Sequence, residues 1–212
     1  MLSDLRVQAV LLDMDGTLVD SDAAVERAWL TWASEYRVDM GSVPLIAHGM
    51  PALGNVRRLR PDLSEAEAAA AAQRQLELQY ADVADVTAAP GAHGLLAELD
   101  RLGLPWAVVT SADVRLAQIR LAAARITPAL LVTIDDVRRG KPDPEGYLLA
   151  ARKLGADPRR CLVVEDAEAG VSAGRAAGAA VAALKGVPAD IQIADLYELT
   201  SLLRAGRVTP RT

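Results

Sequence analysis

A short apolar run that ends in two carboxylates constrains the fold of this chain more than any other feature. Residues 10–12 read Val-Leu-Leu and are followed by Asp13, Met14, Asp15 and Gly16. A continuous apolar run is typical of a strand that is buried on both faces, as in a parallel sheet. Side chains alternate along a strand, so we expect Asp13 and Asp15 to project to the same side. Because open α/β sheets bind ligands at the carboxyl ends of their strands, two like charges there predict a functional site.

The Asp-x-Asp-Gly motif permits two interpretations. Asp-Gly is a common turn signal, so the two acids could simply belong to a turn. Alternatively, two facing carboxylates repel each other unless a cation or a shared proton offsets them, and a hard cation such as Mg²⁺ prefers such oxygen ligands. One carboxylate could then act as a nucleophile that forms an aspartyl phosphate, and the other as a general acid and base. Other segments of the chain have to decide between these interpretations.

A second apolar run ends in hydroxyl side chains. Residues 106–109 read Trp-Ala-Val-Val and are followed by Thr110 and Ser111, with a helix expected to begin near Asp113. A hydroxyl and free backbone N–H groups at a strand end form an anion site. An ordinary helix N-cap would produce the same pattern, so this segment alone leaves both possibilities open.

The remaining charged groups lie at a third strand end and beside a proline. Residues 161–164 form another apolar run that ends in Glu165 and Asp166, although acids also suit the N-terminus of the helix expected next. Lys141 stands between glycine and proline, in a chain with only three lysines among 23 basic residues. A compact ammonium suits a phosphate and would reduce repulsion around the first pair of acids. Together the four segments predict a site for phosphate and metal.

In this order, the four segments resemble the motifs of the haloacid dehalogenase superfamily of phosphohydrolases, and the resemblance covers most of the chain. It implies an α/β fold: a doubly wound, Rossmann-like parallel sheet with an inserted α-helical cap. It also implies that Asp13 attacks phosphorus, while Asp15 protonates the leaving oxygen and then deprotonates water. Thr110, the Ser111 amide and Lys141 would hold the phosphoryl group.

The same resemblance implies a Mg²⁺ cofactor. Asp13, the Met14 carbonyl and Asp166 would hold the ion, and Glu165 would act on it through water. We also expect Asp15 in the metal-binding group, since two facing carboxylates favour a shared cation.

The chain changes character between residues 19 and 89. The alternation of strands and helices gives way to nearly continuous helix, with helices expected at 23–36 and 64–80. A capping box formed by Ser64 and Glu67 opens the second of them. An all-helical insert after the first acidic motif resembles the small, C1-type cap of this superfamily, which closes over the core and excludes water.

These patterns predict two domains joined by two hinges. The core domain is expected at residues 1–18 and 90–212 and the cap domain at 19–89, with hinges near 19–22 and 87–91. The tail 204–212 shows no pattern, and we expect it to fray.

The insert also restricts the activity. It contains no lysine, which argues against the Schiff-base chemistry of phosphonate-cleaving relatives. Related β-phosphoglucomutases carry a histidine and an arginine at positions that correspond to Val25 and Ala52 here, so hydrolysis is favoured over isomerisation. Several segments look like bacterial sugar and sugar-alcohol phosphatases of the β-phosphoglucomutase-like group. We therefore expect hexose or hexitol phosphates as substrates. A β-phosphoglucomutase-like isomerase and a phosphatase for glycerol phosphate or phosphoglycolate remain alternatives, and a non-catalytic phosphate-binding protein is a remote one.

The loop expected at residues 47–59 is the candidate specificity segment. Within it, His48, Asn55 and Arg58 are candidate substrate-binding residues, together with Ser111, because polar groups are needed to recognise the hydroxyls of a polyol. Each of the three cap residues could instead be structural or solvated.

Composition restricts the partners. A net charge of −5 argues against nucleic acid or an anionic membrane as partner, and no apolar run is long enough to span a bilayer. The N-terminus lacks a signal-peptide pattern, so we expect a cytoplasmic protein. The single cysteine, Cys161, reads as buried packing. We expect a small phosphorylated metabolite as ligand and a monomer or weak dimer.

Overall fold

A parallel sheet forms the centre of the molecule in the computed structural model, which describes residues 5–39, 41 and 49–210. In the described residues this sheet has six strands in the order β6-β5-β2-β7-β8-β9. Their bounds are Ala9–Leu12 (β2), Trp106–Val109 (β5), Leu131–Val132 (β6), Cys161–Glu165 (β7), Ala180–Ala183 (β8) and Ile191–Gln192 (β9). The chain winds outward from β2 in both directions, so the predicted doubly wound fold is confirmed.

The pairing of β2 explains why its residues are all apolar. Both β5 and β7 pair with it in parallel, with Leu12 opposite Val108 on one side and Val164 on the other. All four residues of β2 are buried. The backbone N–H of Asp13 still donates to the Val164 carbonyl at 2.9 Å, so this residue is fixed at the sheet's carboxyl edge. The same edge collects the ends of the neighbouring strands.

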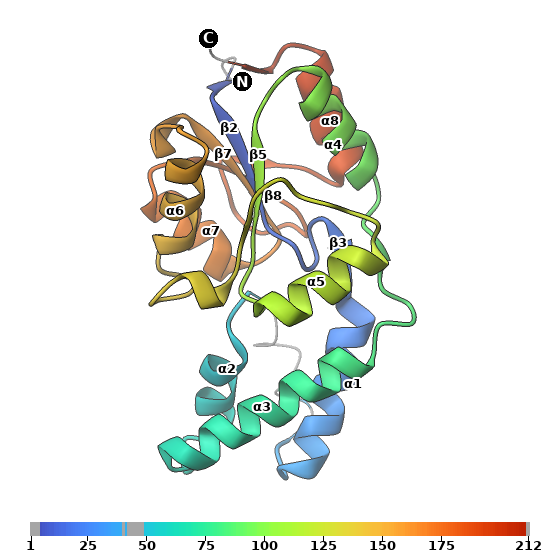
Figure 1. Cartoon of the computed structure of the whole chain (residues 1–212), viewed down its shortest axis with the longest axis vertical. Helices are drawn as coiled ribbons and strands as arrows, with labels where there is room; N and C mark the ends of the chain where they lie inside the picture. The colour runs from blue at the N-terminus through green and yellow to red at the C-terminus, as the bar shows by residue number, and fades with distance from the viewer. Residues whose placement is uncertain (1–4, 40, 42–48, 211–212) are drawn as a thin grey trace.

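Helices cover both faces of the sheet (Figure 1). One face packs on α4 (Ala92–Arg101), α5 (Val114–Ala123) and α8 (Leu196–Arg204), and the other packs on α6 (Glu145–Lys153) and α7 (Glu168–Ala176). Alternate residues of β2 enter the two apolar cores: Val10 and Leu12 face the first, and Ala9 and Leu11 face the second. This alternation is the strand period expected from the sequence.

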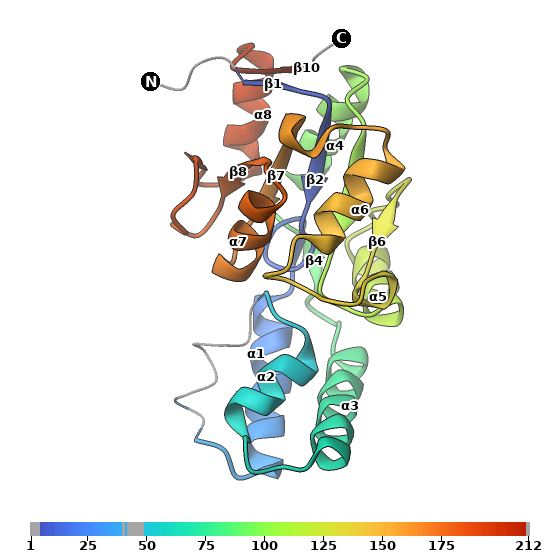
Figure 2. The same cartoon turned by 90° about the vertical axis from the view of Figure 1, so that its left-hand side faces the viewer.

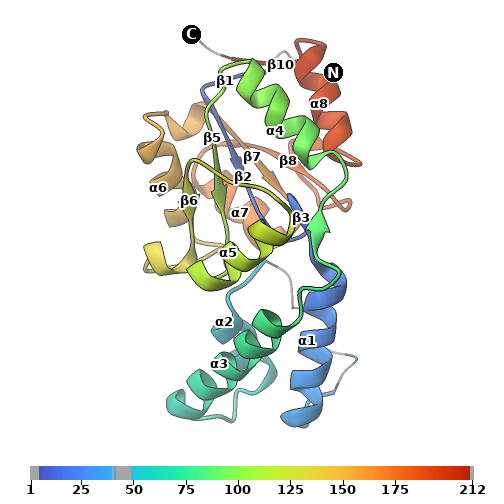
Figure 3. The same cartoon turned by 45° about the vertical axis from the view of Figure 1, so that its right-hand side comes forward.

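A separate helical layer lies beyond the carboxyl edge of the sheet (Figures 1 and 3). It consists of α1 (Asp22–Glu35), α2 (Ala52–Leu59) and α3 (Glu65–Ala81), which enclose an apolar cluster of their own. The predicted capping box at Ser64 and Glu67 is present. Two short antiparallel strands, β3 (Val19–Asp20) and β4 (Thr87–Ala88), connect this layer to the sheet. None of the described helices is both long and apolar enough to cross a membrane.

Two expectations about irregular segments were wrong. The predicted loop at 47–59 contains helix α2, whose Val56 is fully buried against the other cap helices. The tail does not fray throughout, because β10 (Val208–Pro210) pairs in parallel with β1 (Leu5–Val7) and Val208 is buried. Figure 2 shows this small sheet at the end of the molecule opposite the helical layer. In both cases burial of a few apolar side chains orders a segment that has no clear sequence pattern.

Candidate active site

A buried lysine joins two of the predicted acids at the edge of the sheet. The Nζ of Lys141 forms a salt bridge with Asp13 Oδ1 and lies 2.6 Å from Glu165 Oε1. It also donates to the Val109 carbonyl at 3.0 Å, and its side chain is almost fully buried. Burial alone would lower the pKa of Lys141, but the carboxylates of Asp13 and Glu165 raise it above its usual range. The ammonium therefore stays charged, as a phosphate-binding group requires.

Three carboxylates form a compact acidic cluster. Ligand oxygens of Asp13, Glu165 and Asp166 all lie within 4.8 Å of one another, and all three residues are buried. Burial, with the Glu165 carboxylate next, raises the pKa of Asp13 well above its usual range. Gly16 has a φ of 78°, and a Cβ there would lie 2.0 Å from Asp166 Oδ2, so only glycine leaves room for this carboxylate. Oxygen ligands this close, with excess negative charge, fit a divalent cation.

Two further residues that the sequence analysis missed hold the cluster in place. The hydroxyl of Tyr147 donates to Glu165 Oε1 at 2.6 Å, and burial together with that carboxylate raises the pKa of the phenol well above its usual range. Lys185 Nζ lies 2.9 Å from Asp166 Oδ2 and 2.6 Å from Asp22 Oδ2. Lys185 thus links the cluster to the first residue of α1. A tyrosine on an apolar helix face and a lysine after a strand carry no clear sequence signal.

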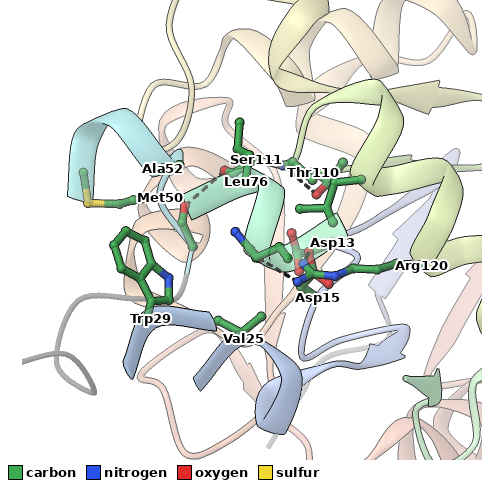
Figure 4. A pocket seen from close by; sticks show the side chains of 14 residues that line it. Asp13, Asp15, Val25, Trp29, Met50, Ala52, Leu76, Thr110, Ser111 and Arg120 are labelled. Atoms are coloured by element: carbon green, nitrogen blue, oxygen red, sulfur yellow. Dashed lines mark hydrogen bonds and ion pairs between the residues drawn. The ribbon is translucent and has the colours of Figure 1, made fainter. Parts of the chain in front are cut away.

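Asp15 lies outside the acidic cluster. Its Oδ1 accepts a hydrogen bond from Ser21 Oγ at 2.7 Å, and its Oδ2 lies 2.7 Å from Nη1 of Arg120. Asp15 and Asp13 line one pocket, in agreement with their expected common side (Figure 4). The Asp15 oxygens contact a hydroxyl and a guanidinium, so Asp15 is not one of the three clustered acids, and its expected place in the metal-binding group stays a prediction.

The hydroxyl residues after β5 line the same pocket, as predicted. Thr110 Oγ1 accepts a hydrogen bond from the Ala112 N–H at 3.1 Å, and Ser111 Oγ donates to the Gly49 carbonyl at 3.1 Å. The latter bond connects the core to the chain segment that leads into α2. Asp113 caps α5, as expected, with its Oδ1 accepting from a backbone N–H.

Apolar side chains from the helical layer form the opposite wall of the pocket (Figure 4). This wall contains Val25, Trp29, Met50, Ala52 and Leu76. Trp29 also packs edge-on against Trp32, with ring centroids 5.3 Å apart, in the apolar cluster of the helical layer. The structure adds that Trp29 reaches the pocket as well.

Two of the predicted cap residues, Asn55 and Arg58, do not line this pocket. His48 lies outside the described residues. Asn55 is fully buried within the helical layer, and Arg58 is exposed, with Nη1 3.3 Å from Met50 Sδ. Neither is among the residues that line the pocket. The polar contribution of the helical layer comes from Gln79 of α3 instead, which the sequence analysis did not single out.

Comparisons with known proteins find similarity to hydrolases, in agreement with the geometry of the site. The model of the haloacid dehalogenase-like hydrolase family matches residues 7–178. Hexitol phosphatase A of Escherichia coli (strain K12) is 43% identical over 187 residues, which cover 88% of this chain and 86% of that protein. The 2-deoxyglucose-6-phosphate phosphatase 1 of Saccharomyces cerevisiae is 32% identical, covering 84% of this chain and 80% of that protein.

A solved structure shares the fold. The β-phosphoglucomutase of Clostridium difficile superposes with a TM-score of 0.83 over 95% of this chain and 97% of that one, at 19% identity. At this identity the likeness concerns the fold alone. The pocket lies at the strand ends, Lys141 bridges two acids there, and the family model matches most of the length of the chain. This chain therefore belongs to the haloacid dehalogenase-like hydrolases.

Proposed function

We propose that this enzyme is a Mg²⁺-dependent phosphatase that hydrolyses hexitol or hexose phosphates through an aspartyl phosphate. The observation that carries the chemistry is the convergence of Asp13, Asp15 and Thr110 on one pocket, with Lys141 bound to Asp13 behind it. The substrate class rests on the similarity to hexitol phosphatase A and to the yeast 2-deoxyglucose-6-phosphate phosphatase.

The reaction has two steps. In the first, an oxygen of Asp13 attacks phosphorus, the bond from phosphorus to the sugar oxygen breaks, and Asp15 gives that oxygen its proton. In the second, Asp15 takes a proton from water, the water oxygen attacks phosphorus, and the bond to Asp13 breaks to release inorganic phosphate. Asp15 suits both roles because its contacts with Ser21 and Arg120 keep it apart from the acidic cluster.

Positive charge and hydrogen-bond donors stabilise the transferred group. Charge spreads over the equatorial phosphoryl oxygens in the transition state, so catalysis depends on positioning and on cations. Lys141 supplies a buried ammonium, and Thr110 and Ser111 supply a hydroxyl and a backbone N–H at the strand end.

The acidic cluster is the proposed metal site. Asp13 and Asp166 would hold Mg²⁺ directly, and Glu165 through water. The Met14 carbonyl does not fit the ligand role that the resemblance implies, because it already accepts the backbone N–H groups of Leu18 and Val19 at 2.9 and 2.8 Å. When bound, the ion supplies positive charge next to the phosphoryl oxygens. The support is the 4.8 Å cluster of three buried carboxylates and the absence of a side chain at Gly16.

The pocket favours hydrolysis over isomerisation. Val25 and Ala52, at the positions where related mutases carry a histidine and an arginine, both line the wall opposite Thr110. Neither can bind a second phosphate. Trp29 and Leu76 offer the carbon chain of a polyol an apolar surface, while Gln79 and Ser111 can pair with its hydroxyls. We further propose that the helical layer is a cap hinged at β3 and β4.

Phosphate release from a panel of esters tests the proposal. The panel contains hexitol, hexose and glycerol phosphates, phosphoglycolate and β-glucose 1-phosphate, each with Mg²⁺ and with a chelator. We expect metal-dependent release that is fastest with hexitol or hexose phosphates. Conversion of β-glucose 1-phosphate to an isomer without phosphate release would instead support the mutase, and preference for glycerol phosphate or phosphoglycolate would correct the substrate class.

A further inference from the structure

A chain of buried polar side chains crosses from the helical layer to Asp15. Gln79 Nε2 donates to Gln75 Oε1 at 2.6 Å, and Arg120 Nη2 donates to Gln79 Oε1 at 2.6 Å. Nη1 of Arg120 then lies 2.7 Å from Asp15 Oδ2. Gln75, Gln79 and Arg120 are only 0%, 7% and 2% exposed. Two glutamines of α3 thus reach the proposed general acid through one arginine of α5.

Burial makes these contacts specific. A buried guanidinium is costly unless it is paired, and the buried Nε of Arg120 has no hydrogen-bond partner among the described residues. The two terminal nitrogens therefore provide the contacts that offset its burial, one with Asp15 and one with Gln79. Gln79 can serve both neighbours in only one orientation of its amide, with its oxygen toward Arg120.

The contact between α3 and α5 does not depend on Arg120 alone. The hydroxyl of Tyr80 hydrogen-bonds Asp113, and the guanidinium of Arg115 lies 4.3 Å from the centre of the Tyr80 ring. Arg115 is an exposed arginine on the same helix that also touches α3 and has no contact with Asp15 among the described residues. Because Arg115 touches α3 without reaching Asp15, it serves as a control for the contact between the two helices.

We propose that Arg120 is a positioning residue that holds the Asp15 carboxylate for proton transfer. Because Arg120 also binds Gln79, the position of this carboxylate depends on the placement of the helical layer against the sheet. This inference rests on the proposed phosphatase activity. It predicts a defect confined to proton transfer by Asp15, while attack by Asp13 and binding of the phosphoryl group stay intact.

An aryl phosphate separates the two steps. With p-nitrophenyl phosphate, the bond to the aryl oxygen breaks as Asp13 attacks, and p-nitrophenolate leaves without needing a proton from Asp15. The second step still requires Asp15 to take a proton from water before the aspartyl phosphate is hydrolysed. A variant with a misplaced Asp15 should therefore release one equivalent of nitrophenolate rapidly and then turn over slowly.

The experiment compares Arg120→Met, Arg120→Lys and Arg115→Met by rapid mixing with p-nitrophenyl phosphate and by steady-state hydrolysis of a hexitol phosphate. We expect Arg120→Met to lower kcat for the hexitol ester by about 100-fold, the cost of a small misplacement of a catalytic group. Its first turnover with the aryl ester should keep the wild-type rate. Arg120→Lys should recover part of the loss, and Arg115→Met should match the wild type in both assays.

Gln79→Leu provides a second variant in case Arg120→Met does not fold, as judged by circular dichroism. It should give the same burst with a smaller loss in kcat, and the two losses should not add in the double variant. An equal slowing of both phases, or no effect in either variant, would overturn the inference. A wild-type enzyme that releases phosphate from no ester would overturn the proposed function instead.

Discussion

The two sides of the pocket differ in the kind of side chain that lines them. The floor, at the carboxyl edge of the sheet, carries buried charges that are paired with one another, such as Lys141 with Asp13 and Glu165. The wall, from the helical layer, is mainly apolar and belongs to a separate core that includes Trp29. In the proposed mechanism, the strand ends carry the chemistry, whereas the packing of helices sets the space around the leaving group. Substitutions on the floor should therefore change the reaction, and substitutions of the apolar residues of the wall should change the choice of substrate.

Loss of the nucleophile should have the largest effect. We expect Asp13→Asn to abolish phosphate release and covalent phosphate incorporation, because an amide oxygen cannot form the aspartyl phosphate. The fold should survive, since Lys141 keeps its contacts with Glu165 and the Val109 carbonyl. Phosphate release and ³²P labelling of the protein measure this, with thermal unfolding as the control. Turnover retained by Asp13→Asn would remove Asp13 from the mechanism.

Loss of the acid should depend on the leaving group. We expect Asp15→Asn to slow hydrolysis of hexitol phosphates by about 10²- to 10⁴-fold, the usual contribution of general acid–base catalysis. The first turnover of p-nitrophenyl phosphate should fall far less, because its leaving group needs no proton. Rapid-mixing kinetics with both esters make the comparison. Equal losses for the two esters would argue against the acid role.

Loss of an acid in the cluster should affect the metal. Asp166→Asn should raise the Mg²⁺ concentration for half-maximal activity by at least about tenfold, the loss that even an outer-shell change can cause. Calorimetric titration of the free protein with Mg²⁺ gives a readout that is independent of activity. Asp20→Asn is the matched control, since Asp20 is an exposed acid in β3 outside the cluster. Unchanged affinity in Asp166→Asn would exclude Asp166 from the metal site.

The same contrast explains what the sequence could and could not predict. A parallel sheet brings the carboxyl ends of its strands to one edge, so polar residues directly after apolar runs are predictable even when far apart in the chain. Asp13, Thr110 and Glu165 follow this rule, and the structure brings them to that edge. The doubly wound sheet follows from the same runs.

The wall is different because helix packing decides which side chains face the pocket. Arg120 lies four residues after Leu116, on the stripe of α5 that is buried, and this spacing was the one signal that could have drawn attention to it. Asn55 was chosen for its polarity within an expected loop, but that segment folds as α2, in which Asn55 is fully buried. The sequence of a helix does not show which neighbouring helices it packs against, so it cannot show which of its side chains face the pocket.

Arg58 provides the smallest expected effect and the sharpest test of the wall. Its side chain is exposed and contacts Met50, while Gln79 lines the pocket directly. Arg58→Ala should therefore change kcat/KM for hexitol phosphates by less than about twofold, as is usual for surface substitutions. Gln79→Ala, measured beside it on the same set of esters, should lower kcat/KM several-fold more and change the ranking of hexitol, hexose and glycerol phosphates. A change of ranking in Arg58→Ala alone would mean that the wall seen here is not the one that meets the substrate, and α2 would have to shift to bring Arg58 inward.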